Sequence, residues 1–256
     1  MKLEIIRLEN QLMNSNCFIV VDNLSKSCII IDPASEKSER EIKYIEEKSL
    51  HLDFIIVTHA HADHCWGVNA LKDRYPETKI VYSAACYKNM KRSIMLFFKM
   101  WHEDETYDYN LMPADIAIDR NTEWNWHDYN IKFVLTPGHS LGSMCIEIDG
   151  KLFTGDTMMP FPPYFNGRGS NEDEWDISVT MMVEKYDSET ELYPGHGDVI
   201  SIGEWKANKD GTKAYKAYFD SIKNYINIRF VKVKGHSNDR YNDMADILAK
   251  EALGLN

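Results

Sequence analysis

Short apolar runs rich in β-branched residues recur along the first 160 residues, and they constrain the fold more than any other feature. Asn, Asp, Gly and Pro separate the runs, so each one is typical of a strand that ends in a turn. The strands are expected at 3–7, 17–21, 28–32, 54–58, 79–83, 131–136, 143–148 and 151–155. Helices are expected at 36–48 and after residue 64. This alternation predicts an α/β fold in which helices cover central sheets.

The stretch 88–118 fits this alternation poorly. It holds a cluster of Met, Leu, Phe and Trp side chains, followed by acidic and Tyr-rich sequence. A helix packed on the core is the favoured interpretation. An insertion that covers a site is the alternative.

The composition is that of a globular protein: 256 residues, 44% of them hydrophobic and 27% charged. Disorder and a mini-protein are excluded, and the length allows one large domain or one domain with an appendage. The net charge of −11 argues against a nucleic-acid partner or an anionic membrane surface, which require a basic footprint.

The cysteines and the apolar runs predict a cytoplasmic location. Five scattered cysteines form no C-x-x-C pair, so they are expected to be free thiols in a reducing compartment. The first 16 residues carry charges through their only apolar run, unlike a signal peptide. No apolar run is long enough to span a membrane.

The sequence HAHADH at 59–64 directly follows an apolar strand and supplies His59, His61, Asp63 and His64. Three imidazoles and a carboxylate within six residues are ligands typical of a borderline-soft divalent ion such as zinc. His139, Asp156 and His196 each follow an apolar strand at a Gly-containing turn. Strand ends converge at one edge of an α/β sheet, so these seven side chains are expected to form one site. Seven ligands are too many for one tetrahedral ion and suit two.

The motifs HAHADH, PGHS (137–140), TGD (154–156) and PGHG (194–197), in this order, resemble the metallo-β-lactamase superfamily. They are most similar to its hydroxyacylglutathione hydrolase (glyoxalase II)-like branch. The resemblance covers about residues 1–202 and implies a four-layer αβ/βα sandwich. It implies one metal on His59, His61 and His139, a second on Asp63, His64 and His196, and Asp156 as the bridge. Because His61 stands where di-iron oxygen reductases of the superfamily carry Glu, zinc is favoured over iron or manganese.

The resemblance implies a metallo-hydrolase that uses a metal-bridging hydroxide. A water bound to zinc has a pKa of about 7, so hydroxide is available at neutral pH to attack an electrophilic centre. Asp63 is implied both as a ligand of the second metal and as the catalytic group that handles protons. The expected substrate is a small-molecule thioester, ester or lactone.

Two residues are candidates for substrate binding. Arg168, in NGRGS at 166–170, occupies a place similar to a Gly-Arg motif of the glyoxalase II-like branch, and its guanidinium is well shaped to pair with a carboxylate. Tyr164, in PFPPYF at 160–165, is a candidate wall of the pocket. Loop packing or a plain surface position is the alternative for each.

Residues 203–256 differ in charge from the rest of the chain. They hold ten Lys or Arg against seven Asp or Glu, whereas residues 1–202 hold 19 against 33. We therefore expect two domains, 1–202 and 203–256, the second a short α-β-α appendage with helices at 209–225 and 241–253 and a strand at 228–233. Its VKGHS (233–237) and the pattern of Asn242, Ala245, Asp246, Leu248 and Ala249 resemble the carboxyl-terminal portion of bacterial ribonuclease H.

That resemblance implies no ribonuclease activity. His236 and Asp246 match functional positions of ribonuclease H, but the other three carboxylates have no counterpart here. Two-metal phosphodiester cleavage needs the full set. The lone strand of the tail predicts either addition to an edge of the hydrolase sandwich or pairing with the same strand of a second copy. The second, a homodimer, is favoured because the sandwich is complete without the tail.

Two classes of function are consistent with the sequence. The favoured one is the dinuclear hydrolase of a thioester, ester or lactone. The alternative is a metal-dependent phosphodiesterase or nuclease of the same superfamily, to which the tail brings the nucleic acid. The excess of acidic residues in 1–202 opposes a polyanionic substrate.

Overall fold

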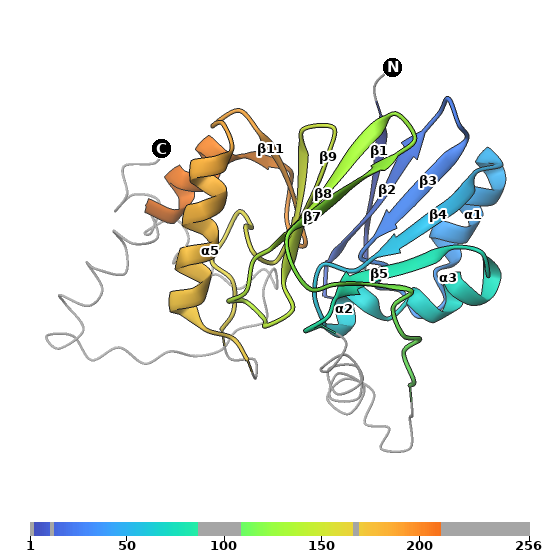
Figure 1. The fold of residues 1–256 in the computed structure, drawn as a ribbon, viewed down its shortest axis with the longest axis horizontal. Coiled ribbons are helices and arrows are strands. Elements are labelled where there is room, and N and C mark those ends of the chain that lie inside the picture. The colour runs from blue at the N-terminus through green and yellow to red at the C-terminus, as the bar shows by residue number, and fades with distance from the viewer. Residues whose placement is uncertain (1–2, 11–12, 87–108, 166–168, 211–256) are drawn as a thin grey trace, which may run out of the picture. The chain divides into compact units, whose positions relative to one another are not determined.

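The computed structural model describes residues 3–10, 13–86, 109–165 and 169–210. The chain divides into two compact units, Met1–Trp205 and Lys206–Asn256. In the described part of the first unit, two six-stranded mixed sheets lie face to face with helices outside them (Figure 1). The ribonuclease H-like pattern, the helix at 241–253 and the strand at 228–233 lie outside the described residues and stay predictions.

The first sheet has the order β1-β2-β3-β4-β5-β6. Its first two pairs are antiparallel, and the pairs from β3 to β6 are parallel. Its strands are β1 (Glu4–Glu9), β2 (Asn16–Asp22), β3 (Ser27–Ile31), β4 (His51–Ile56), β5 (Lys79–Ser83) and β6 (Ile116–Ile118).

The second sheet has the order β12-β11-β10-β9-β8-β7. Only β10 and β11 are parallel neighbours; the other pairs are antiparallel. Its strands are β7 (Thr122–Trp126), β8 (Tyr129–Leu135), β9 (Met144–Ile148), β10 (Lys151–Gly155), β11 (Glu191–Pro194) and β12 (Ile200–Ser201).

Helices cover the outer face of each sheet. The helices α1 (Glu39–Lys48), α2 (Ala62–Cys65) and α3 (Val68–Arg74) pack on the first sheet. The helix α5 (Glu172–Lys185) and the helical residues 202–205 lie on the side of the second sheet (Figure 1). The helix α5 begins at Asn171, whose side chain accepts hydrogen bonds from the backbone of Asp173 and Glu174. The expected four-layer αβ/βα sandwich is confirmed.

Strand β2 shows why the layers form. All seven of its residues are buried, and alternate side chains enter different cores. Ile19 and Val21 pack with the helices of the first sheet, whereas Phe18 and Val20 pack between the sheets against residues such as Phe153. A strand buried on both faces reads as a continuous apolar run, which is the pattern that the sequence shows.

The helix expected over 88–118 is wrong for the described part of that stretch. Residues 109–118 contain no helix, and β6 pairs with β5 at the edge of the first sheet. The carboxylate of Asp115 accepts a hydrogen bond from the backbone of Ile80, and Leu111 is buried in the core. Pairing with the exposed edge of β5 satisfies more backbone groups than an isolated helical turn could. Residues 87–108 lie outside the described residues.

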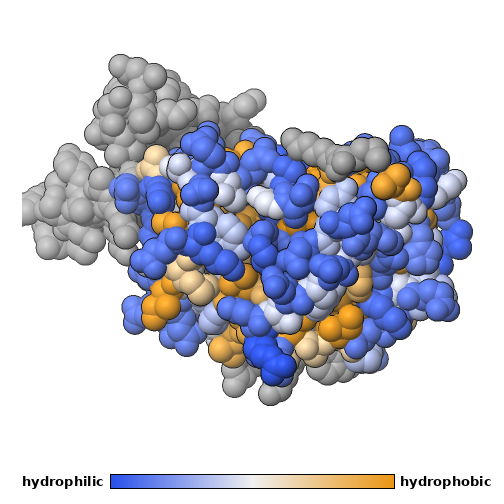
Figure 2. Space-filling model, turned by 45° about the horizontal axis from the view of Figure 1, so that its top comes forward, coloured by the Kyte–Doolittle hydropathy of each residue, from blue (hydrophilic) through white to orange (hydrophobic). Residues whose placement is uncertain are grey.

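The surface and the helices both bear on whether the described chain could enter a membrane. Hydrophilic side chains dominate the face drawn in Figure 2, with apolar side chains scattered among them. Among the described residues, none of the helices has the length and apolar character needed to cross a membrane.

Candidate metal centre

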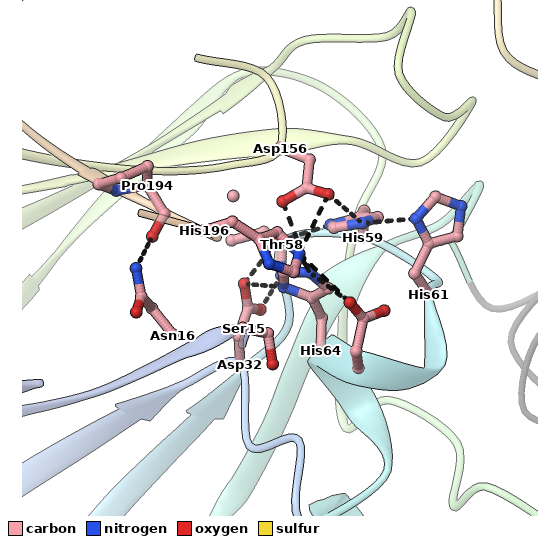
Figure 3. A network of polar contacts seen from close by, with 12 residues as sticks. Ser15, Asn16, Asp32, Thr58, His59, His61, His64, Asp156, Pro194 and His196 are labelled. Carbon is pink, nitrogen blue, oxygen red and sulfur yellow. Dashed lines mark hydrogen bonds and ion pairs between the residues drawn. The ribbon is translucent and has the colours of Figure 1, made fainter. Parts of the chain in front are cut away.

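The site lies where strands of both sheets end at one edge of the sandwich (Figure 3). Strand β4 leads to His59 and the short helix α2, and β8, β10 and β11 lead to His139, Asp156 and His196. Gly155 allows the close approach of the two sheets, because a Cβ at this position would lie 2.4 Å from Thr58 Oγ1. The seven ligand candidates named from the sequence lie together in one cluster.

Three histidines form one half of the cluster, here called the His59 group: His59, His61 and His139. His59 Nε2 and His139 Nε2 lie 2.9 and 3.0 Å from the same atom, His61 Nδ1. A neutral imidazole has one N–H and one lone pair, so a single proton cannot satisfy three converging nitrogens. A cation would accept all three lone pairs at once.

The other half, here called the His64 group, consists of Asp63, His64 and His196. His196 Nε2 lies 3.2 Å from Asp63 Oδ2 and 3.3 Å from His64 Nε2. Asp63 and His64 come from α2, whereas His196 follows β11 of the second sheet. The group therefore exists only when the two sheets are packed together.

Asp156 lies between the two groups. Its Oδ1 is 3.5 Å from His64 Nε2, and its Oδ2 is 3.4 Å from His139 Nε2. The carboxylate is buried, at 7% exposure, and faces imidazoles of both groups (Figure 3). An anion in this position can interact with a cation in either group.

Burial and neighbouring charges separate the pKa values of the histidines. Burial and neighbouring histidines hold the pKa of His59 well below its ordinary value, and burial lowers that of His139 to about 4. Burial also lowers the pKa of His61. Burial opposes the charged form of His64 too, but Asp156, Asp63 and Asp32 outweigh it and raise its pKa to about 10. The His59 group is thus neutral at pH 7, which is the ligating form of imidazole.

Two buried atoms of the cluster have no hydrogen-bond partner: Asp156 Oδ1 and His139 Nδ1. Leaving a buried polar atom unsatisfied costs about 1–3 kcal/mol, so such atoms are rare without a reason. Together with the converging nitrogens of the His59 group, the unpaired carboxylate oxygen fits a cation held between the side chains. The residues present therefore fit divalent metal ions.

Asp32 and Thr58 support the His64 group, and the sequence reasoning missed both. Asp32 Oδ2 lies 2.9 Å from His64 Nδ1 and accepts a hydrogen bond from Thr58 Oγ1, while its Oδ1 accepts one from the Thr58 backbone. This contact leaves His64 Nε2 to face the cluster. The sequence did mark Asp32, because this residue follows an apolar strand, as the other candidate ligands do.

Asn16 supports the turn that carries His196. It is fully buried at the start of β2, and its side-chain amide donates to the backbone oxygens of Pro194 and Gly197 at 2.9 and 2.8 Å. Its backbone N–H donates to Gly195, and its side-chain oxygen accepts from Arg7. No short motif marks such a residue, since its partners lie about 180 positions away.

Of the two candidates for substrate binding, only Tyr164 lies within the described residues. Tyr164 is 71% exposed, so most of its side chain is in contact with solvent. Arg168 lies outside the described residues. In the same loop, Phe165 packs against Trp175 of α5, with ring centroids 5.4 Å apart.

The two packed mixed sheets and the His/Asp cluster at their shared edge define a metal-binding protein of the hydrolase type. Residues 11–196 match the family described as the Metallo-beta-lactamase superfamily, and the chain belongs to it. The predicted superfamily is thereby confirmed. The resemblance of the tail to ribonuclease H is not shown by these comparisons.

Two curated relatives illustrate the similarity in sequence. A hydroxyacylglutathione hydrolase of Pelagibacter ubique is 27% identical over 201 residues, which cover 77% of this chain and 71% of the relative. The "Probable polyketide biosynthesis zinc-dependent hydrolase BaeB" of Bacillus velezensis is 28% identical over 205 residues, 80% of each chain.

Solved structures show the same fold. The BLEG-1 B3 metallo-beta-lactamase superposes with a TM-score of 0.70 at 20% identity, over 78% of this chain and 95% of that one. TTHA1623, solved in a di-iron-bound form, superposes with a TM-score of 0.66 at 18% identity, over 78% and 96%.

Proposed function

We propose that this protein is a dinuclear metal-dependent hydrolase of a thioester, ester or lactone. The observation that carries the proposal is the position of Asp156 between two sets of three candidate ligands, with imidazoles of both sets 3.4–3.8 Å from its carboxylate oxygens. One ion alone would leave three of the seven side chains without a role.

The assignment of ligands follows the two groups. His59, His61 and His139 hold one ion, Asp63, His64 and His196 hold the other, and Asp156 bridges them. Five imidazoles and two carboxylates suit zinc better than a hard cation such as magnesium. The name of the relative BaeB, which includes "zinc-dependent", supports the same choice. Iron and manganese are the alternatives.

The reaction requires distinct contributions from the side chains. When bound, the two ions supply a Lewis acid and a source of hydroxide near neutral pH. Asp156 places negative charge between the groups and reduces the repulsion between cations. The Oδ2 atom of Asp63, 3.2 Å from His196 Nε2, accepts the proton lost by the nucleophile and returns it to the leaving group. Asp63 suits this role because its side chain keeps 14% exposure and so stays accessible to a substrate.

Two observations support acyl substrates over nucleic acids. Two similar proteins carry the names of a hydroxyacylglutathione hydrolase and a polyketide biosynthesis hydrolase, and the first of these names specifies an acyl group. The net charge of −11 opposes a polyanion at the site. The homodimer through residues 203–256, the domain division at residue 202 and the cytoplasmic location stay predictions.

Turnover of an acyl thioester and of a single-stranded RNA, measured side by side with zinc-loaded protein, tests the proposal. We expect thioester hydrolysis and no RNA cleavage. Asp63→Asn should lower kcat at least 100-fold, because loss of a proton-transferring group costs about 10²–10⁴-fold. Asp149→Asn, in the exposed turn between β9 and β10 of the second sheet, is the matched control. RNA cleavage, or full metal loading with no ester or thioester turnover, would refute the proposal.

A further inference from the structure

Three exposed apolar side chains lie on loops that adjoin the metal-site turns: Met13, Leu141 and Phe161, here called the apolar rim. Their exposed fractions are 44%, 52% and 49%. Only four other large apolar side chains among the described residues are classed as exposed, so the rim holds a large share of them. Such a concentration beside a catalytic centre is a sign of a binding surface.

Phe161 lies against the turn that carries His196. Gly197 has φ +82°, and a Cβ there would lie 3.2 Å from Phe161 Cε1 and 3.0 Å from Pro160 Cγ. The ring therefore contacts the backbone at the residue next to a proposed ligand. Glycine at this position is what lets the ring approach the turn so closely.

Met13 and Leu141 lie on two other segments that adjoin the metal centre. Ser15, two residues after Met13, pairs with His196 in an isolated backbone bridge. Leu141 follows His139 by two residues, and its Cδ1 would lie 3.1 Å from a Cβ placed on Gly169. Each of the three side chains thus belongs to a segment that holds, or directly contacts, a proposed ligand.

The charge around the rim is the second observation. Residues 13–15, 139–142, 157–165 and 195–199 contain neither Lys nor Arg. Arg7 lies beside the His196 turn, but its guanidinium is bound to Asn16, Asp198 and Glu9. Asp198, on the same turn as His196, is the partner of Arg7 in an ion pair of 2.7 Å. The described residues of these loops therefore offer no Lys or Arg to pair with a carboxylate, and they can bind an apolar group; Arg168 lies outside the described residues.

We propose that the apolar rim binds the acyl chain of the substrate, and that this chain is uncharged and several carbons long. The inference rests on the proposed hydrolase function and specifies its acyl group. The carbonyl carbon would lie at the metal centre, and the chain would extend over Phe161, Leu141 and Met13. Removing apolar area from water is favourable by about 25 cal/mol per Å², or ~0.8 kcal/mol per methylene, which corresponds to about fourfold in kcat/KM.

The test uses the full chain loaded with zinc and one uncharged thiol, N-acetylcysteamine, esterified with acetyl, butanoyl, hexanoyl, octanoyl and adipoyl groups. We expect kcat/KM to rise about fourfold per methylene from acetyl to hexanoyl. We expect the hexanoyl ester to exceed the adipoyl ester, which has the same number of carbons and a terminal carboxylate, at least tenfold.

Single substitutions test which side chains produce the dependence on acyl-chain length. Phe161→Ala and Leu141→Ala should each lower the ratio of octanoyl to acetyl kcat/KM by about tenfold, while metal content stays at two ions per chain. Leu24→Ala is the matched control, because Leu24 is 63% exposed in the β2–β3 turn at the other end of the strands. Its ratio should equal that of the wild type.

The outcomes separate the two proposals. Thioester turnover with no dependence on chain length, or with a preference for the adipoyl ester, overturns the rim inference and leaves the hydrolase intact. An unchanged ratio in Phe161→Ala and Leu141→Ala also overturns it. No turnover of any thioester by protein that holds two ions overturns the hydrolase function itself.

Discussion

The side-chain amide of Asn16 donates a hydrogen bond of 2.8 Å to the carbonyl oxygen of Gly197. Asn16 begins β2 of the first sheet, and Gly197 follows His196 in the second. The same amide also donates to Pro194, so one buried side chain fixes both ends of the turn that aims His196 at the cluster. The position of this imidazole therefore depends on a contact between the two sheets.

Asn16→Asp keeps the size of the side chain and removes both donors. A carboxylate would face two carbonyl oxygens, so we expect the His196 turn to shift and the affinity of the His64 group for metal to fall about 10–100-fold. Isothermal titration with zinc measures this, and Asn125→Asp on the exposed edge of β7 is the control. Two ions bound at wild-type affinity by Asn16→Asp would contradict a positioning role.

Asp156 and His196 should differ in their effect on metal content. Asp156→Ala is expected to weaken both ions, because its carboxylate faces both groups. His196→Ala is expected to deplete mainly the ion of the His64 group. Elemental analysis of protein purified without chelator, read against two ions for the wild type, distinguishes them. Equal losses in the two variants would exclude a bridging Asp156.

Asp32→Asn tests the support of His64. Asp32 has φ +56°, which Asn tolerates well, so the substitution leaves the backbone unstrained. The Asn side chain has only one oxygen to accept hydrogen bonds from Thr58 and His64. The His64 imidazole would therefore be held less firmly in its orientation. We expect a 10–100-fold loss in metal affinity of the His64 group. A loss of thermal stability at unchanged metal affinity would instead assign Asp32 a purely structural role.

Asp53 joins the two sheets at a place distinct from the metal centre. Burial opposes its ionisation, but hydrogen bonds from Trp126, His51 and His127 hold the pKa of this carboxyl below its ordinary value. A folded-state pKa below the unfolded one means that the ionised form stabilises the fold above pH ~4, and that this stability is lost as pH falls further.

Asp53→Asn should therefore lower the free energy of unfolding by about 1–2 kcal/mol at pH 7, with a smaller difference from wild type below pH ~4. Urea unfolding at several pH values measures it. Asp128→Asn is the control, because Asp128 is exposed in the β7–β8 turn, next to His127. A difference that stays constant between pH 7 and pH 3 would show that the charge of Asp53 contributes nothing.

The strands and most of the candidate ligands could be predicted from the sequence because their signals are local. Apolar runs such as 28–32 and 54–58 become β3 and β4, since a strand buried on both faces needs apolar residues at every position. HAHADH could be recognised because four ligand types lie within six residues. His139, Asp156 and His196 could be found because each follows a strand at a Gly turn.

Elements with weaker local signals were not predicted. The strand β7 reads TEWNW, whose alternating burial becomes visible only when Trp124 and Trp126 pack between the sheets. The helix α5 has a readable cap at Asn171, but its apolar residues form no narrow stripe. The edge strand β6 has three residues and depends on its pairing with β5.

Tertiary structure alone decided how the ligands are held and what surrounds them. His59 and His196 are 137 positions apart, and Asn16 and Gly197 are 181 apart, yet each pair belongs to one network. The sequence determined which side chains are placed at the ends of the strands, because backbone periodicity and turn chemistry act over a few residues. Packing of the two sheets determined which of them meet, because the apolar surfaces between the sheets can be removed from water only when the strand ends come together.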